Sequence, residues 1–422
     1  MTARAPAPAR VRADACPGAL QTHAAADGAL ARVRVPGGLL TGDQLRALAA
    51  AARELGDGAL ELTSRGNVQL RGLAPGAEAG LGDRLAAAGL LPSATHERVR
   101  NVLASALTGR AGGHVDVRPW VRALDAAICA DPALAALPGR YLATLDDGRG
   151  DVAGLGGDVG LLALSPAEVA LTLAGVDSGL RTTPDGAVAL ALAATRAFLD
   201  ERTAQGGTAW RLAELDDGPR CVAARIRPPG GRHLAGVDRS RGPEAPRPGQ
   251  GERLDATGER HVAAVSSGGR QSHGPPLVGT SEQTDGRVAL IAVVPLGRLD
   301  AAQVELLGRV ADEVQLTPWR SVVVPDLAED AVDDVAVALH RTGLVFDEAS
   351  PWTRVTACAG RPGCAKSLAD VRADAAQAVA AGTLPADGAR QHWAGCERRC
   401  GRPRGEVVDV VATGTGYRVV GG

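Results

Sequence analysis

The chain has 422 residues, of which 45% are hydrophobic and 22% are charged, and its formal net charge is -2. This length exceeds the roughly 250–300 residues at which a single core stops growing, so we expect two or more domains. The near-neutral charge excludes a basic coat for nucleic acid, and five Trp, two Tyr and two Phe are too few for the stacking platforms that bind single strands.

The first 15 residues scatter arginines among alanine and proline, with no apolar stretch behind them. We expect a disordered tail there and not a signal peptide. The most apolar later segments, residues 160–176 and 186–199, are interrupted by Glu168 and Arg196. The sequence therefore predicts no membrane-spanning helix and no membrane partner.

A pattern that begins near residue 27 returns in the second half of the chain. The first copy has Asp27-Gly28, a strand-like run, Pro36, Gly38, Leu40, Thr41 and Gln44, and the second has Asp285-Gly286, a strand-like run, Pro295, Gly297, Leu299, Asp300 and Gln303. The offset is 258 residues at the turn and 259 from the proline onward, so one inserted residue separates the copies. Chance similarity of two common strand–helix–strand units is the alternative, but the number of matched positions favours a duplication.

Each copy has the pattern of a strand, a helix and a further strand. Alternating valines and arginines over residues 31–35 predict a half-buried strand. Thr41 with Gln44, and Asp300 with Gln303, stand at the spacing of a capping box and predict the start of a helix in each copy. The strand that follows bends at an arginine in both copies.

Two other regions lie between the copies. Residues 95–217 carry apolar stretches that we expect to be helical, notably 166–174 and 187–201. Residues 235–274 are dense in Gly, Pro, Ser, Gln and charge, and this composition predicts a linker.

Four of the seven cysteines lie in the last 70 residues. Cys358 and Cys364 form C-x5-C, Cys396 and Cys400 form C-x3-C, and 31 residues separate the pairs. Four thiolates on two loops are the ligand set of a [4Fe–4S] cluster. Zinc is the first alternative, although C-x5-C is wider than the usual zinc spacing, and unliganded core cysteines are the second. An odd, low cysteine count without a disulfide framework also favours a reducing, cytoplasmic compartment.

These cysteines, the duplicated unit and the run Leu-Thr-Ser-Arg-Gly-Asn-Val-Gln-Leu at residues 62–70 resemble the nitrite and sulfite reductase superfamily. Within it, residues 15–20, 137–141 and 316–320 are similar to the precorrin-3B synthase family. The resemblance implies an α+β fold with two ferredoxin-like half-domains and two α/β domains related by pseudo-twofold symmetry.

The domain boundaries follow from the resemblance together with the composition. We expect a tail at 1–15, half-domain 1 at 16–92, a reductase-like domain without a cluster at 93–234, a linker at 235–274, half-domain 2 at 275–350 and a cluster-binding domain at 351–422. Since the halves provide each other with a partner, a monomer is expected.

The resemblance also implies roles for individual arginines. Sulfite reductases grip their oxyanion with four basic residues above a siroheme, and three of these positions are filled here by Arg65, Arg100 and Arg140. The fourth falls on Leu142, which leaves the charge of a small buried anion unmet. We expect the three arginines to hold the carboxylates of a tetrapyrrole instead, because guanidinium groups bind carboxylates in bidentate fashion.

The implied reaction is the oxygen-dependent hydroxylation of precorrin-3A at C20 with closure of a γ-lactone. The implied cofactors are the [4Fe–4S] cluster, held by the four cysteines, and a mononuclear non-haem iron. NADH or a reduced electron-donor protein would supply electrons, although no G-x-G-x-x-G fingerprint follows a strand. A facial triad needs two histidines and a carboxylate, for which His114, Asp116 and His392 are the candidates.

Two other functions stay open from the sequence. One is a siroheme-dependent sulfite or nitrite reductase, and the other is a non-catalytic redox or zinc-binding regulatory protein. Glu397 and Arg399, beside the cluster cysteines, depart from the patterns of both enzyme families. The sequence does not say what these two residues do.

Overall fold

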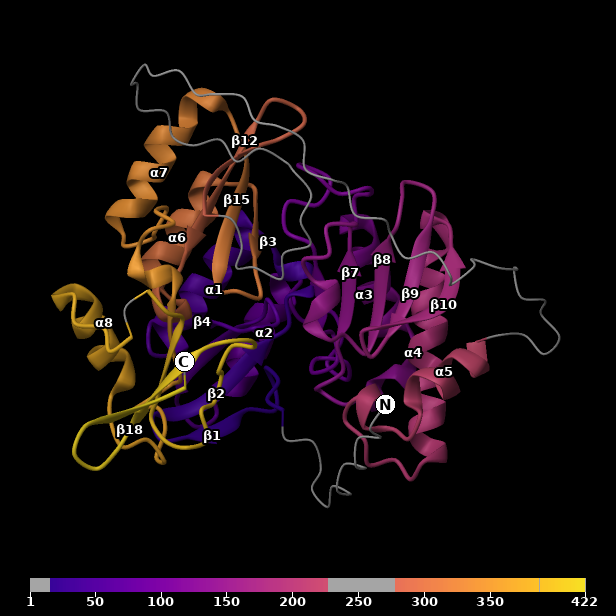
Figure 1. The fold of residues 1–422 in the computed structure, drawn as a ribbon, viewed down its shortest axis with the longest axis horizontal. Coiled ribbons are helices and arrows are strands. Elements are labelled where there is room, and N and C mark those ends of the chain that lie inside the picture. The colour runs from indigo at the N-terminus through magenta and orange to yellow at the C-terminus, as the bar shows by residue number, and fades with distance from the viewer. Residues whose placement is uncertain (1–15, 227–277, 387, 422) are drawn as a thin grey trace, which may run out of the picture.

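The computed structural model describes residues 16–226, 278–386 and 388–421, which Figure 1 shows arranged around four β-sheets. Two sheets built mainly from the repeats occupy the centre and left of the view, a third lies at the right, and a fourth lies at the lower left. The predicted tail and linker fall outside the described residues. Among the described residues, no helix is both long and apolar enough to cross a bilayer.

The two copies of the repeat form two antiparallel sheets of matching order. The first sheet runs β1 (His23–Ala25), β2 (Gly28–Val33), β5 (Val68–Leu73), β4 (Ala59–Leu62) and β13 (Arg298–Asp300). The second runs β11 (Gly279–Glu282), β12 (Val288–Val293), β15 (Ser321–Leu327), β14 (Glu313–Leu316) and β3 (Leu39–Thr41). The α+β fold with a duplicated half-domain is therefore confirmed.

Each copy lends one short strand to the sheet of the other. Strand β13 of the second copy pairs with β4 of the first, with Leu299 opposite Leu60. Strand β3 of the first copy pairs with β14 of the second, with Leu40 opposite Val314. Neither sheet is complete without the other copy, so the repeats interlock.

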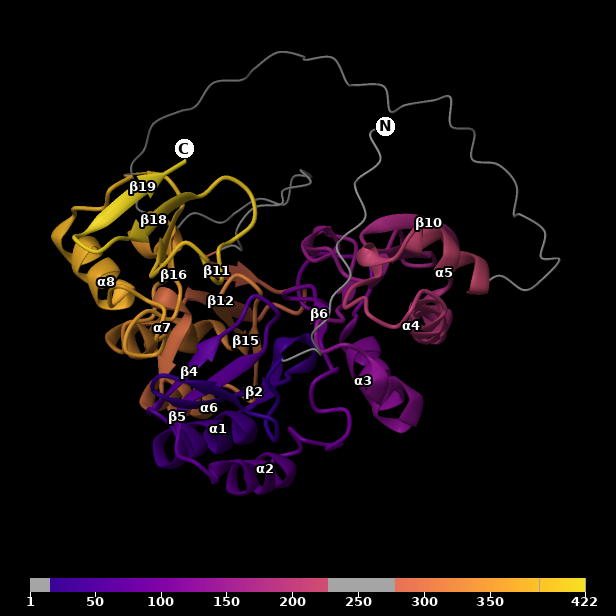
Figure 2. The same cartoon turned by 90° about the horizontal axis from the view of Figure 1, so that it is seen from below.

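Helices α1 (Gly42–Leu55) and α2 (Ala77–Ala87) of the first copy, and α6 (Ala301–Val310) and α7 (Val332–Arg341) of the second, cover these sheets. Figure 2 shows α1, α2 and α6 together on one side of the molecule, away from the C-terminal sheet. Both predicted capping boxes are present, Thr41 with Gln44 at α1 and Asp300 with Gln303 at α6. The predicted helix starts are confirmed.

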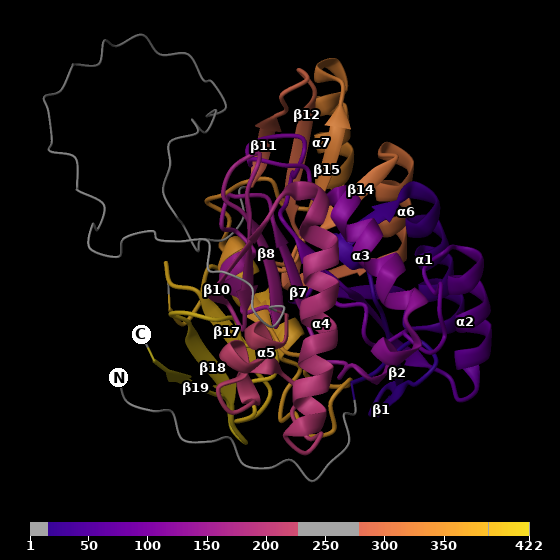
Figure 3. The same cartoon turned by 90° about the vertical axis from the view of Figure 1, so that its right-hand side faces the viewer.

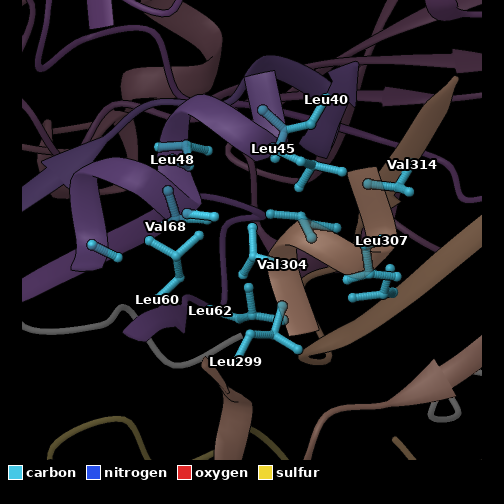
Figure 4. Packing of buried hydrophobic residues seen from close by; sticks show 14 of the residues in the cluster. Leu40, Leu45, Leu48, Leu60, Leu62, Val68, Leu299, Val304, Leu307 and Val314 are labelled. Carbon is cyan, nitrogen blue, oxygen red and sulfur yellow. The ribbon is translucent and has the colours of Figure 1, made fainter. Parts of the chain in front are cut away.

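Helices α1 and α6 pack closely on each other. A Cβ added to Gly42 would lie 2.7 Å from the carbonyl oxygen of Gly308, and one added to Gly308 would lie 2.7 Å from that of Gly42. Figure 4 shows Leu45 and Leu48 of α1 in the same cluster as Val304 of α6. One continuous apolar core thus joins the two copies into a single unit.

The third sheet lies within residues 93–234. Its order is β10 (Val176–Thr182), β9 (Val169–Leu173), β8 (Val159–Ala163), β7 (Ala143–Asp146) and β6 (Val102–Ala104). Strands β6, β7 and β8 are parallel, and helices α3 (Arg118–Ala130), α4 (Ala187–Ala204) and α5 (Gly218–Ile226) accompany the sheet, with α4 running beside β7 and β8 in Figure 3. The helix predicted at 166–174 was wrong, because these residues form β9.

The fourth sheet lies within residues 351–422 and positions the cysteines. It consists of β16 (Val355–Ala357), β17 (Gln391–Ala394), β18 (Val408–Ala412) and β19 (Tyr417–Val420), with helix α8 (Val371–Ala381). Strands β16 and β17 are parallel neighbours, so their carboxyl ends lie at the same edge. Cys358 directly follows β16 and Cys396 follows β17 by two residues, which brings the two cysteine loops together.

Candidate functional site

The cysteine loops are joined by backbone contacts. The Cys358 amide donates to the carbonyl of Trp393 at 3.0 Å, and the Gly395 amide donates to the Cys358 thiol at 3.2 Å. Partial desolvation raises the pKa of Cys400, and the neighbouring thiols of the other three cysteines raise it further, whereas Arg398 lowers it. All four predicted ligands therefore lie within electrostatic reach of one another.

The separation of the four thiols indicates which metal centre they fit. Zinc with Zn–S distances of about 2.3 Å would bring its sulfur ligands to about 3.8 Å from one another. Among the described residues, the only group of three or more candidate ligands within 4.8 Å is Asp146, Asp147 and Asp151. No three of the four thiols therefore lie within 4.8 Å of one another, so they do not form the tight set that a zinc ion needs, whereas four thiolates on two loops are the donor set of a [4Fe–4S] cluster. The residues therefore fit such a cluster.

Buried polar atoms without a partner gather around the cysteine loops. Of the six such side-chain atoms among the described residues, three belong to Arg320, His392 and Arg399. Arg399 lies in the second cysteine loop, His392 of β17 is within electrostatic reach of Arg320, and Arg320 donates from its other terminal nitrogen to the Gly401 carbonyl at 3.3 Å. Gln391 and Trp393 lie on the opposite face of β17, where Trp393 packs against Tyr417. Unsatisfied groups of this kind are rare in folded proteins, and their concentration here is consistent with a missing group at the cysteines.

The second cysteine loop is fastened by a buried carboxylate. Asp409 of β18, 3% exposed, accepts from Arg399 at 2.9 Å and from Arg402 at 2.9 Å. Glu397 lies on the surface and pairs with Arg418. The residue that departs from the family pattern at 399 therefore has a structural partner in this chain.

Arg65 contacts the residue that precedes Arg140, at a second position apart from the cysteine loops. Arg65 occupies the turn between β4 and β5 and donates to the carbonyl of Gly139 at 3.5 Å. Arg140 lies over the ring of Trp210, 5.0 Å from its centroid. Burial lowers the pKa of Arg65 to about 10; Arg211 and Arg32 act in the same direction, while Asp158 and Cys16 oppose the shift. Arg65 has no ion pair with a carboxylate among the described residues, so its guanidinium can accept an anionic ligand.

Arg100 lies elsewhere. It is 4% exposed, forms two hydrogen bonds of 2.7 Å with Asp125 of α3, and donates to the Leu90 carbonyl at 3.1 Å. Its charge is neutralised and its donors are engaged within the protein. We therefore correct the prediction for Arg100 and do not assign it to a substrate site.

Arg34 was missed by the sequence analysis. The alternation over residues 31–35 predicted that it faces solvent, but it is 2% exposed and one of its terminal nitrogens has no partner. Burial lowers its pKa to about 9, with Arg32 and Arg65 adding to the effect and Cys16 and Glu97 opposing it. Arg34 directly follows β2 and is covered by distant segments, donating to the carbonyls of Arg98 and Pro17. The local pattern of residues 31–35 does not reveal this burial.

Leu142, at the fourth position of the expected basic quartet, lies in an apolar cluster. It is 4% exposed and packs with Leu103 and Val152, with Leu155 and Trp319 at the margin. No cation is supplied at this position.

The three candidate iron ligands are not brought together. His114 lies beside the loop after β7, with its amide donating to the Asp147 carbonyl at 2.6 Å, and Asp116 pairs with Arg118 at 2.8 Å. His392 lies on β17, where its Nδ1 is 3.0 Å from the Thr356 hydroxyl. Burial lowers the pKa of His392 to about 4, and Arg320 contributes. These residues do not fit a preformed facial triad.

The three neighbouring carboxylates of Asp146, Asp147 and Asp151 stabilise the loop after β7. Asp146 accepts from four backbone amides at 2.8–3.1 Å, and Asp147 pairs with Arg149. Asp151 accepts from the Ser105 hydroxyl at 2.6 Å. These bonds account for the position of all three carboxylates, so the trio is explained as a loop anchor.

Known proteins share this architecture. The profile of the nitrite/sulfite reductase ferredoxin-like half domain matches residues 23–88 and 281–341, the two copies of the repeat. The NirA protein of Mycobacterium tuberculosis superposes with a TM-score of 0.66 at 18% identity, covering 93% of this chain and 74% of that one. The chain has the nitrite/sulfite reductase fold.

Similarity in sequence to curated proteins extends over nearly the whole chain. Precorrin-3B synthase from a Sinorhizobium species is 28% identical over 428 residues, covering 98% of this chain and 83% of that protein. The ferredoxin–nitrite reductase of Synechococcus elongatus is 26% identical, covering 92% of this chain and 77% of that protein. The predicted resemblance to precorrin-3B synthase and its superfamily is confirmed, and the relatives are oxidoreductases.

Proposed function

We propose that this chain is an oxygen-dependent enzyme of the precorrin-3B synthase type. It would hydroxylate precorrin-3A at C20, with the ring A acetate closing a γ-lactone. One atom of O2 enters the tetrapyrrole and the other leaves as water, and two electrons and two protons complete the balance. NADH or a reduced donor protein supplies the electrons.

The observation that carries the proposal is the end-to-end similarity to precorrin-3B synthase. The apolar surroundings of Leu142 add support, because a small multiply charged oxyanion needs a cation there. A tetrapyrrole with several carboxylate arms does not depend on that single position. Arg65 and Arg140 are the residues we assign to those arms, and Arg34 lies within electrostatic reach of Arg65.

The residues of this chain fit the [4Fe–4S] cluster but not the mononuclear iron. Cys358, Cys364, Cys396 and Cys400 would hold a [4Fe–4S] cluster, which supplies one-electron transfer when bound. The mononuclear iron implied by the resemblance finds no ready ligand set in His114, Asp116 and His392. We assign no ligand to that iron.

The test is turnover. Protein purified without air and loaded with iron and sulfide should convert precorrin-3A when O2 and a reductant are added, and should not convert it under argon. A fully loaded protein that leaves precorrin-3A unchanged in air would refute the proposal.

The similarity to nitrite reductase favours a second candidate, a siroheme-dependent sulfite or nitrite reductase. Freshly isolated protein with stoichiometric siroheme would show an intense Soret band, whereas a cluster alone gives broad, weaker visible absorption. A stoichiometric Soret band would decide for the reductase. Zinc without iron or labile sulfide would instead indicate the regulatory protein.

A further inference from the structure

Three arginines from different parts of the chain donate to backbone carbonyls at the cysteine loops. Arg372 donates to the carbonyl of Cys358 at 3.2 Å. Arg71 donates to the carbonyl of Gly363, which precedes Cys364, at 2.6 Å. Arg320 donates to the carbonyl of Gly401, which follows Cys400, at 3.3 Å. Each contact thus falls on a ligand or on its direct neighbour.

The arginines converge from separate elements. Arg71 lies on β5 of the first half-domain, Arg320 lies in the turn between β14 and β15 of the second, and Arg372 lies on α8. The side chains of Arg71 and Arg372 are 6% and 19% exposed, and one terminal nitrogen of Arg320 is buried without a partner. Charges this far from water are poorly screened by salt.

Two carboxylates offset part of this charge. Asp27 accepts from Arg71 at 2.9 and 3.0 Å. Glu61 of β4, 6% exposed, lies 2.6 Å from Arg372 and 3.7 Å from Arg71.

Arg298 and Arg320 differ in whether they have a carboxylate partner. Arg298 also reaches Glu61, at 3.9 Å, but is paired with Asp57 at 3.0 Å. Within the described residues, Arg320 has no carboxylate partner within ion-pair distance. Its pKa is lowered by burial and by Arg372, as expected for a cation that lacks a close counter-ion, while Glu61 opposes the shift. The four arginines therefore outnumber the three carboxylates, Asp27, Asp57 and Glu61, beside the cysteines.

We propose that Arg71, Arg320 and Arg372 are positioning residues that fix both cysteine loops and raise the reduction potential of the cluster, and that Glu61 limits this increase. The inference rests on the proposed [4Fe–4S] cluster. A cluster gains one negative charge on reduction, so a nearby fixed cation favours the reduced form and a nearby carboxylate opposes it. Because arginine stays protonated, the effect does not depend on pH in the working range.

The experiment is a redox titration of the full chain with its cluster, reduced stepwise by dithionite and followed by visible absorption and electron paramagnetic resonance. Arg320→Gln should lower the potential and Glu61→Gln should raise it, each changing the ratio of reduced to oxidised cluster by roughly tenfold, or about 59 mV for one electron. Arg372→Lys, which keeps the charge, should stay near the wild type in potential. Arg309→Gln and Glu54→Gln, exposed residues of α6 and α1, are the matched controls and should not shift it.

Opposite shifts for the two charge-removing variants would support the proposal, because a purely structural role predicts loss of cluster without a dependence on sign. If the Arg320→Gln protein does not hold the cluster, the other two variants test the proposal. The potential of Glu61→Gln should be higher than that of the wild type, and the potential of Arg372→Lys should stay near it. Loaded variants with unchanged potentials, or shifts of one sign throughout, would overturn the proposal. Wild-type protein that binds no iron and sulfide would instead refute the cluster itself.

Discussion

At the scale of single residues, the proposed substrate site depends most on Arg65. Its guanidinium is largely buried, its one protein acceptor is the Gly139 carbonyl at 3.5 Å, and neighbouring arginines add to its charge. Asp158 offsets part of this charge without forming an ion pair with Arg65, and a carboxylate of the substrate would supply a direct partner. Arg140 is more exposed and rests on Trp210, which holds its plane in place.

Replacing Arg65 by Ala should weaken precorrin-3A binding by about 10- to 100-fold, the loss expected for a charge-assisted hydrogen bond. The cluster spectrum should not change. Binding is measured by titration of the tetrapyrrole absorbance, with Arg84→Ala on α2 as the control because Arg84 forms an exposed pair with Glu54. Loss of the cluster in Arg65→Ala would show that the arginine is structural.

Asp151 predicts a pH dependence of stability. Burial raises its pKa to about 6, and repulsion from Asp146 adds to the shift. The unfolded chain has a value of about 3.9, so the folded state holds this proton more tightly and the protein loses stability as pH rises from about 4 to about 6. Asp151→Asn removes this titration.

Urea unfolding of Asp151→Asn and wild type at several pH values tests this. The difference in free energy of unfolding should move in favour of the variant by up to about 3 kcal/mol across that window. The exposed Asp185→Asn is the control. Parallel profiles for Asp151→Asn and wild type would show that the carboxyl titrates normally.

Residue roles differ in how visible they are in sequence. The four cysteines are recognisable because their spacing reflects the loops that hold a metal centre. Arg34 is not, because its burial comes from distant segments, with its donors meeting the carbonyls of Arg98 and Pro17. Arg100 matches a motif, yet its pairing with Asp125 depends on how α3 packs.

At the scale of elements, helices α1 and α6 pack directly on each other across the two repeats. The reciprocal approach of Gly42 and Gly308 leaves no room for a side chain at either position. Their capping boxes were predictable because the cap and its partner are three residues apart. Strand β9 was not, because an apolar run that is buried in a sheet has no period that separates it from a buried helix.

Gly308→Ala should destabilise the protein by about 1–3 kcal/mol, since the methyl group would force the helices apart. Gly80→Ala on α2 is the matched control, because nothing lies within 4 Å of the added Cβ. That control should be neutral or stabilise by up to about 1 kcal/mol. Thermal or urea unfolding measures both, and equal effects of the two substitutions would contradict the packing described here.

At the scale of the whole molecule, the exchange of β3 and β13 makes each repeat part of the other's sheet. The similarity of the repeats is evident from sequence, but this exchange is not, since it pairs residues 237–276 positions apart through three-residue strands.

The exchange predicts that cutting the chain between the halves leaves them together. A protease site inserted between residues 240 and 250 should, after cleavage, yield two fragments that co-elute in native gel filtration and separate in denaturant. Uncleaved protein is the reference for elution volume. Fragments that separate without denaturant would contradict the interlocked arrangement.

The most direct test of the central claim is mass spectrometry of precorrin-3A after incubation with the loaded protein, a reductant and ¹⁸O2. We predict a product that has gained one oxygen atom, that carries the heavy isotope and that contains the γ-lactone. Product without the label, or precorrin-3A recovered unchanged beside an intact cluster, would contradict the account.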